Sequence, residues 1–337
     1  MSLEALLRKT ICTPLVMALA AGTLAGCSNP DEHPGSTTRS AVATSDLASA
    51  PVAQLVAWGD GPAELGLRPR VEESMTLGAP AVAVGPGGDV FVLDAPKQRI
   101  VRLGREVTAV ATVSRDADDL AVSADGAFAV RRTMTTKILV LDAAGQRLGE
   151  VDARGVGDVD SVVLGPSRRV AVSTGFQETF QLGSPSFPQL PQAVAYSRNV
   201  GAALLPSGDG VVAVAKDGSA ELRVVAQASS QDGHAETRAS WPLGRATAVR
   251  IVGASGRVVC MRIEHVDTAK QGPIEVAREA RCVDASTGAT VLRTDLPAPG
   301  LYVPRRELTF ARNLLVFAHP EREGLRVTTW TVEGGAR

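Results

Sequence analysis

The chain has 337 residues, of which 45% are apolar, so it is long enough to bury a large hydrophobic core. Its formal net charge is −1, which argues against nucleic acid or a polybasic attachment to membranes. Aromatic residues make up only 4%, whereas 33 glycines and 20 prolines are spread along the chain. This composition favours short strands and tight turns over long helices.

The first 26 residues have the layout of a secretory signal peptide. Arg8 and Lys9 precede an uncharged run over residues 11–26, and a cationic segment followed by an apolar one is typical of such peptides. After this run, no apolar segment reaches the roughly 18 residues that a membrane-spanning helix needs. We therefore expect residues 1–26 to direct export.

The apolar run ends in Leu-Ala-Gly-Cys at residues 24–27, which resembles the lipobox of bacterial lipoproteins. The resemblance implies cleavage before Cys27, a diacylglyceryl group on its thiol and acylation of its new amine, which together anchor the protein firmly in a membrane. Ser28, in place of aspartate, resembles the signal for the outer membrane. The expected location is the bacterial cell envelope, facing the periplasm or the surface. An ordinary cleaved signal and a membrane helix with a chance cysteine are the alternatives.

Residues 27–51 follow as a polar segment rich in Ser, Thr, Ala and Pro. Such a composition cannot build a hydrophobic core and is typical of a flexible tether. We therefore expect a lipidated Cys27 with a disordered tether over residues 27–51, and a folded domain over residues 52–337.

Two cysteines remain in the expected mature domain, Cys260 and Cys282, and export places them in an oxidising compartment. They lie in strand-like runs at residues 257–266 and 274–284. If these runs form a hairpin centred near Gln271, the two cysteines face each other, and we expect a disulfide. A metal site with two thiolates is the alternative, but no further cysteine and no CxxC spacing supports it.

Internal repetition is the main indication of the fold. Six segments each contain an apolar strand, a short turn and a second apolar strand, at residues 80–94, 119–132, 161–174, 202–215, 249–262 and 307–319. Their turns are expected at Gly88, Gly126, Arg168, Gly210, Gly256 and Asn313. A further strand-turn-strand unit follows each pair, most clearly at residues 137–151 and 279–293. Four short strands in about 40 residues is the spacing of a β-propeller blade.

The two ends of the domain agree with a closed ring. The chain finishes on a third strand with no fourth behind it, and an isolated strand at residues 53–58 precedes the first repeat. A last blade left incomplete would expose unpaired N–H and C=O groups. We therefore predict an all-β, six-bladed β-propeller in which the N-terminal strand closes the last blade. Seven blades, an all-β sandwich or two smaller barrels are the alternatives.

The first repeat, at residues 58–67 and 78–103, resembles NHL-type propellers. It has a Gly-Pro loop, an inner strand, a Gly-Asp turn and then Asp94, Arg99 and Ile100 at the family's spacing, with Lys97 where asparagine is usual. The resemblance covers about 40 residues and implies a fold rather than a function. Enzymes on NHL-like propellers, such as lactone hydrolases and amidating lyases, hold metals through several blades, and no such ligand set is recognisable in the sequence.

Two acidic segments, at residues 115–120 and 156–162, precede inner strands at equivalent positions of successive blades. Their carboxylates could converge and hold Ca²⁺, which prefers several hard oxygens; the ligands would be Asp116, Asp118, Asp119, Asp158 and Asp160. The alternative is that these aspartates cap turns. We therefore expect no cofactor, with calcium as the alternative.

Two histidines form a second candidate site. His265 and His319 each end the second strand of a blade, in consecutive blades, with Glu264 and Glu321 nearby. Equivalent strand ends lie on one face of a propeller, so a shared metal or acid–base site is conceivable. Two surface histidines without a shared function are the alternative.

No nucleophile elbow, P-loop, zincin helix or dinucleotide fingerprint occurs in the sequence. The basic spots at residues 165–169 and 303–307 are interpreted as solvated turns. We expect a binding or scaffolding protein whose loops on one propeller face contact a protein or another envelope component, with no nucleic acid. A metal-dependent hydrolase or lyase using the central channel is the alternative, and a spacer without a ligand is a third. An enzyme would bring His and carboxylates with perturbed pKa values to the channel mouth.

Overall fold

The computed structural model describes residues 50–69, 75–190, 193–194, 197–227, 236–267 and 275–333, all within the compact unit Thr44–Arg337. The expected signal peptide, Cys27 and nearly all of the tether lie outside the described residues and stay predictions. Within the described part of the chain, no helix has both the length and the apolar character needed to cross a membrane.

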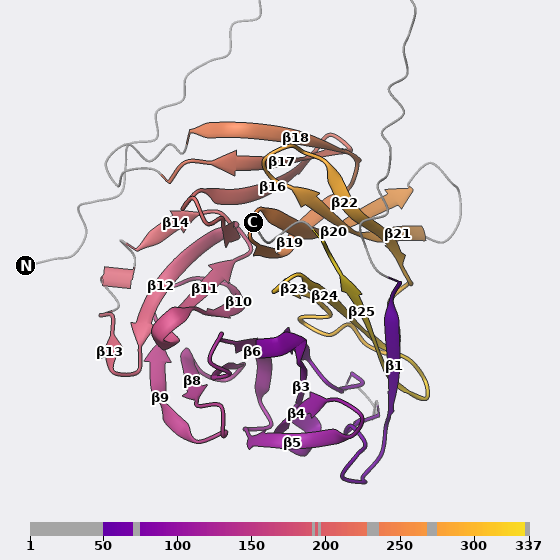
Figure 1. The fold of residues 1–337 in the computed structure, drawn as a ribbon. Coiled ribbons are helices and arrows are strands. Elements are labelled where there is room, and N and C mark those ends of the chain that lie inside the picture. The colour runs from indigo at the N-terminus through magenta and orange to yellow at the C-terminus, as the bar shows by residue number, and fades with distance from the viewer. Residues whose placement is uncertain are drawn as a thin grey trace, which may run out of the picture. The chain divides into compact units, whose positions relative to one another are not determined.

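The described residues form six β-sheets arranged around a centre, as the sequence predicts (Figure 1). The first blade contains β2 (Ala81–Val84), β3 (Val90–Asp94), β4 (Arg99–Leu103) and β5 (Val107–Thr112). The second blade contains β6 (Ala117–Val122), β7 (Phe128–Arg132), β8 (Lys137–Leu141) and β9 (Arg147–Asp152). The third blade contains β10 (Val159–Leu164), β11 (Val170–Thr174), β12 (Glu178–Ser184), β13 (Phe187–Pro188) and β14 (Arg198–Val200). The third blade departs from four strands, because β13 and β14 both pair with β12.

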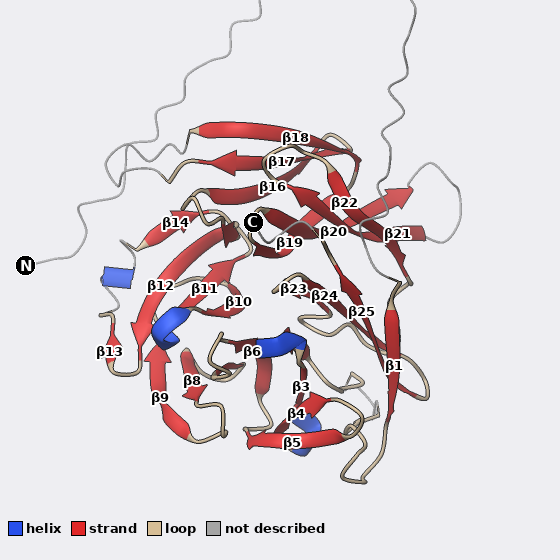
Figure 2. Cartoon of the chain, in the orientation of Figure 1, coloured by secondary structure: helices blue, strands red, loops and turns tan. Residues whose placement is uncertain are grey.

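The fourth blade contains β15 (Ala203–Leu204), β16 (Gly210–Lys216), β17 (Ser219–Val225) and β18 (Thr237–Arg245). The fifth blade contains β19 (Ala248–Ser255), β20 (Val258–Asp267), β21 (Glu275–Asp284) and β22 (Thr290–Leu296). The sixth blade contains β23 (Leu308–Ala311), β24 (Leu314–Pro320), β25 (Gly324–Thr331) and β1 (Val52–Ala57). In the described part of the chain, helical structure is limited to short turns (Figure 2), among them η1 (Pro86–Gly88), η2 (Ala95–Lys97) and η3 (Pro166–Arg168).

The N-terminal strand closes the ring, which confirms the prediction. β1 pairs antiparallel with β25 over its whole length, from Val52 opposite Thr329 to Ala57 opposite Gly324. The strand begins one residue earlier than the sequence indicates. Its Val56 side chain is buried in the core between the sixth and first blades.

Tight turns connect the first and second strands of the blades. The second and sixth blades turn at Gly126, with a φ of 82°, and at Asn313, with a φ of 61°, a left-handed conformation that glycine and asparagine adopt most readily. One predicted turn was misplaced: Gly210 is the first residue of β16, and the turn lies just before it at residues 205–209.

Apolar side chains from neighbouring blades pack together to form the core. Leu93 and Ile100 of the first blade share a cluster with Leu120 and Phe128 of the second, and all four are almost completely buried. The alternation of inward and outward residues along each strand supplies these contacts. The burial of this apolar surface between the sheets stabilises the ring.

The boundary between the third and fourth blades is bridged by amide side chains. Gln177 accepts a hydrogen bond from the Ala213 N–H and donates one to the Ala213 carbonyl. Gln227 forms the same reciprocal pair with the backbone of Val200. Each glutamine therefore satisfies one backbone N–H and one C=O, as a neighbouring strand would.

The hairpin of β20 and β21 confirms the predicted cysteine pairing. Cys260 lies directly opposite Cys282 in the register of the two strands, and the two residues form a disulfide. Both side chains are fully buried in the core between the fifth and sixth blades.

Candidate functional site

A central cavity of about 620 Å³ lies within the ring of inner strands. Its lining residues come from β2, β6, β10, β15, β19 and β23, with additional residues from the strands next to them. This volume is typical of small-molecule sites. The cavity, called the channel below, is the place where one ligand can contact several blades.

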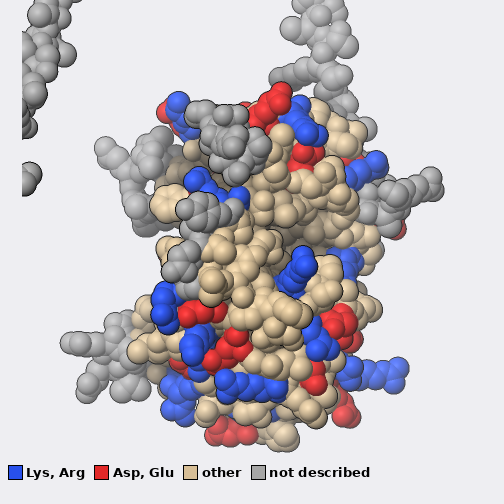
Figure 3. Space-filling view, turned by 90° about the vertical axis from the view of Figure 1, so that its left-hand side faces the viewer, with Lys and Arg blue, Asp and Glu red and all other residues tan. Residues whose placement is uncertain are grey.

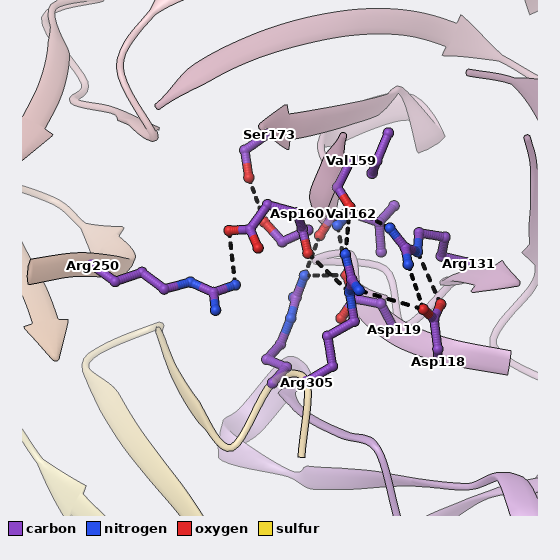
Figure 4. Close-up of polar contacts among 11 residues, drawn as sticks. Asp118, Asp119, Arg131, Val159, Asp160, Val162, Ser173, Arg250 and Arg305 are labelled. Atoms are coloured by element: carbon purple, nitrogen blue, oxygen red, sulfur yellow. Dashed lines mark hydrogen bonds and ion pairs between the residues drawn. The ribbon is translucent and has the colours of Figure 1, made fainter. Parts of the chain in front are cut away.

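Charged side chains gather where the inner strands begin. A parallel bridge joins Ala81, the first residue of β2, to Arg306, which lies just before β23, so these strands enter the ring from the same side. We call this region the charged end of the channel (Figure 4); its side chains come from four blades and are Asp118, Asp119, Asp160, Arg250, Arg305 and Arg306.

Hydrogen bonds fix two arginines at the charged end. Arg131 of β7 donates to both carboxylate oxygens of Asp118, with a distance of 2.9 Å from Nε to Oδ1. Arg305 lies 3.7 Å from the same carboxylate and donates to the backbone oxygens of Val159 and Asp160. Arg131 also donates to the Val159 oxygen. Such charge-assisted bonds hold guanidinium groups in defined orientations, so the second, third and sixth blades are joined here.

Asp119 is enclosed behind Arg306. Its Oδ2 accepts hydrogen bonds of 2.7 Å from the Val162 N–H and from Arg306 Nη2. The side chain is 0% exposed, and Oδ1 has no hydrogen-bond partner among the described residues. Burial raises the pKa of Asp119 and outweighs the lowering effect of Arg306. Because the carboxylate cannot reach a ligand, Asp119 acts as a positioning residue for Arg306.

Arg250 of β19 is the most accessible cation at the charged end. It forms an ion pair of 2.8 Å with Asp160, yet its side chain is 37% exposed. Burial lowers the pKa of Arg250, Asp160 raises it, and the positive charges of Arg262 and Arg306 lower it. Arg250 therefore lies in a locally cationic environment despite its acidic partner.

A second ion-pair network lies between the fifth and sixth blades. Glu307, which precedes β23, accepts a hydrogen bond of 2.6 Å from Arg262 Nη1 and one from Arg278 Nη2. Arg278 also donates to the Pro297 oxygen at 3.2 Å. Glu307 and Arg278 are both buried, so this network joins the two blades. Arg262 and Glu307 are its members that line the channel.

The charge presented to the channel is positive. The lining contains five arginines, namely Arg250, Arg262, Arg305, Arg306 and Arg312, but only two carboxylates, Asp160 and Glu307. The acidic partners of Arg305 and Arg306 lie behind them, more deeply buried than the arginines that they hold. By contrast, the outer side of the propeller near β12–β14 shows side chains of both signs interspersed (Figure 3).

The predicted calcium ligands do not form a metal site. Asp118, Asp119 and Asp160 each pair with an arginine, whereas Asp158 is exposed and the backbone oxygen of Asp116 accepts hydrogen bonds in a turn. Among the described residues, no group of three or more His, Cys, Asp or Glu side chains could hold a metal ion. The structure therefore gives the calcium hypothesis no support.

The structure gives a shared metal site of the two histidines no support either. His319 stacks on Phe317, with ring centroids 5.8 Å apart, and burial lowers its pKa. The buried Nδ1 atom of His265 has no hydrogen-bond partner in the described residues. Neither ring belongs to a possible metal group within the described part of the chain.

One sequence interpretation is wrong. The basic segment at residues 303–307 is not a solvated turn, because Arg305 and Arg306 contact acidic residues of the second blade and backbone oxygens of the third. The signal that could have revealed them is positional: the two arginines precede an inner strand, as do the acidic segments with which they interact. Arg168, in the other basic segment, does lie in a turn, between β10 and β11, where it pairs with Asp125 at 3.2 Å.

The residues that resemble the NHL signature hold a loop. Buried Asp94 accepts hydrogen bonds from Arg99 Nε at 2.9 Å and from the Gly66 N–H at 3.0 Å. Lys97 donates to the carbonyl oxygens of Gly61 and Glu64, at 2.7 and 2.9 Å. These contacts fasten the segment that follows β1 onto the first blade, and they lie apart from the residues that line the channel.

No family model matches the chain, and no curated protein matches it. Among 307 solved chains that match in structure, it is similar to the PQQ-bound aldose sugar dehydrogenase of Streptomyces coelicolor, with 14% identity, a TM-score of 0.45 and coverage of 84% of this chain and 99% of that chain. It is also similar to a catalytically inactive virginiamycin B lyase from Staphylococcus aureus with quinupristin, with 9% identity, a TM-score of 0.45 and coverage of 84% of this chain and 100% of that chain. A third similar structure is the β-propeller domain of Cps50 (Swd1) from Myceliophteria thermophila, with 16% identity, a TM-score of 0.38 and coverage of 75% of this chain and 96% of that chain. At these values the similarities say nothing about the site, and the six-bladed fold is established by the sheet topology.

Proposed function

We propose that this chain is a lipid-anchored protein of the bacterial cell envelope whose propeller binds an anionic ligand in its channel. The observation that carries the binding role is the cationic lining, in which five arginines face two carboxylates. Guanidinium groups recognise carboxylates and phosphates through paired hydrogen bonds. A narrow channel with one sign of charge also focuses the electric field and attracts oppositely charged ligands.

The ligand's anionic group would bind near Arg250 and Arg305. Their side chains are 37% and 30% exposed, so they can donate to a ligand without first being uncovered. Arg305 is already held by backbone oxygens and by Asp118. Such prior ordering reduces the entropy lost when a ligand binds.

A metal-dependent hydrolase or lyase was the alternative. The one acid–base group with a raised pKa at the charged end is Asp119, and it is fully enclosed. The accessible groups there are arginines paired with carboxylates, an arrangement that supports anion binding better than proton transfer.

Titration of the full chain, purified in detergent, with inorganic phosphate and citrate tests the binding role. We expect both anions to bind by isothermal titration calorimetry, and more weakly as salt is added. Arg250→Gln should weaken binding by about tenfold, the effect of losing a charge-assisted hydrogen bond. Arg168→Gln removes an arginine from an ion pair that does not line the channel and should leave affinity unchanged. Absence of binding, or equal effects of the two substitutions, would refute the proposal.

The anchor is tested separately. Cys27→Ala should release the protein from membranes or block its processing, because the lipid would have no thiol to attach to. Processing of the wild-type chain that is insensitive to globomycin would contradict lipidation.

A further inference from the structure

We infer that the ligand is an elongated organic dianion, with an apolar segment between its two anionic groups, that binds along the channel between Arg250 and Arg312. The inference rests on the proposed anion binding and specifies the class of ligand. Three features of the channel support it: a cation at the end opposite the charged end, the lack of a carboxylate partner for that cation among the described residues, and accessible apolar side chains in between.

Arg312 lies at the far end of the channel from Arg305 and Arg306. It follows β23, in the turn that leads to β24, whereas Arg305 and Arg306 precede β23. Arg312 lies six positions after Arg306, and β23 makes up most of the chain between them, which corresponds to about 20 Å between their Cα atoms at about 3.3 Å per residue. Both arginines line the same cavity, so it presents positive charge at each end.

Arg312 differs from the arginines at the charged end because no carboxylate of the described residues pairs with it. Its one hydrogen bond runs from Nη1 to the Val84 carbonyl oxygen at 2.6 Å. The side chain is half-buried, and burial lowers its pKa. A partly desolvated cation without a counter-ion is costly, and an anionic group bound beside it would offset this cost.

The wall between the two ends carries accessible apolar side chains beside polar ones such as Ser161 and Thr309. Val163 of β10 and Leu204 of β15 line the cavity and are 43% and 41% exposed, although both lie on inner strands. Ala254 of β19 adds a small apolar side chain from another blade. Burying an apolar segment of a ligand against this wall is favourable, whereas a charge in the middle of the ligand would lose solvation without gaining a partner.

A graded series of α,ω-dicarboxylates tests the inference against the matched monocarboxylates. Succinate, adipate, suberate, sebacate and dodecanedioate would be titrated by calorimetry into the full chain in detergent, below their micelle-forming range, beside fatty acids of equal length. We expect affinity to pass through a maximum with length. At that maximum the dicarboxylate should bind about tenfold more tightly than the monocarboxylate, because one further charge-assisted bond forms.

Two variants separate the roles of the two ends. Arg312→Gln should abolish the preference for dicarboxylates over monocarboxylates, whereas Arg250→Gln should weaken the binding of both classes. Arg312→Lys keeps the charge and should retain part of the preference, which distinguishes lost recognition from a folding defect when melting temperatures are compared.

Equal affinities of mono- and dicarboxylates at every length, or a preference that survives Arg312→Gln, would overturn the dianion inference while leaving anion binding intact. Failure of every carboxylate to bind the folded wild-type chain would overturn both the inference and the proposed function.

Discussion

Val56 provides a direct test of how the N-terminal strand closes the propeller. The side chain is 3% exposed and packs in the cluster that contains Val316, Leu325 and Val327 of the last blade. Val56→Ala removes two methyl groups, each contributing about 0.8 kcal/mol by burial, and the remaining cavity adds a further penalty. We therefore expect the free energy of unfolding to fall by about 2 kcal/mol.

Val52 offers a matched control in the same strand. It pairs with Thr329 in the register of β1 and β25, but its side chain is 69% exposed. Val52→Ala makes the same chemical change with the same loss of strand propensity. Its effect on the free energy of unfolding should stay within about 0.5 kcal/mol, as is usual for surface substitutions.

Urea denaturation of the full chain in detergent, followed by tryptophan fluorescence, measures both values. The comparison is valid where the slope of the free energy of unfolding against urea concentration is the same for the variants and the wild type, since that slope reports the surface exposed on unfolding. Two variants as stable as the wild type would mean that the strand does not complete the last blade. Two equally destabilised variants would mean that strand propensity, and not burial of Val56, is responsible.

Three further predictions concern the folded domain. Reduction of the Cys260–Cys282 disulfide, which closes a separation of 22 residues, should lower the free energy of unfolding by about 3 kcal/mol; two free thiols in the purified native protein would contradict it. In the variant Gln177→Glu, the new side chain can donate to the Ala213 carbonyl only when it is protonated. Urea midpoints should therefore show that the variant loses stability relative to the wild type as the pH rises. A difference that does not depend on pH would contradict the role of this bridge. Burial raises the pKa of Asp119 above 3.8, so the folded chain keeps the carboxyl proton to a higher pH than the unfolded chain does. The free energy of unfolding of the wild type, minus that of Asp119→Asn, should therefore decline as the pH rises above 3.8. A difference that does not change with pH would refute this prediction.

The propeller could be predicted because its determinants repeat locally. Each blade carries the same order of apolar strands and turns, and turn residues such as Gly126 and Asn313 occupy left-handed conformations at the expected places. Closure by β1 followed from the requirement that the edge of the last blade be paired. The disulfide followed from hairpin symmetry, because the turn between β20 and β21 fixes which residues oppose each other.

The parts that the sequence did not predict depend on contacts between distant segments. The reciprocal hydrogen bonds of Gln177 join the third blade to the fourth, and glutamine in a turn carries no sign of such a partner. The two added strands of the third blade, β13 and β14, also break the repeat that made the other blades recognisable. Where the repeat weakens, periodicity no longer identifies the pairing of strands.

The charged end shows why the correct placement of residues does not by itself define the chemistry of a site. The acidic segments of the second and third blades do meet at one end of the channel, as their equivalent positions indicate. Whether they hold a cation depends on the charge already present, and that charge comes from Arg305 and Arg306, far away in sequence. A calcium ion would have to displace guanidinium groups from Asp118 and Asp119 and enter a channel whose lining is already positive. The balance of charge, more than the number of oxygens, therefore favours the anionic ligand that we propose over a cation.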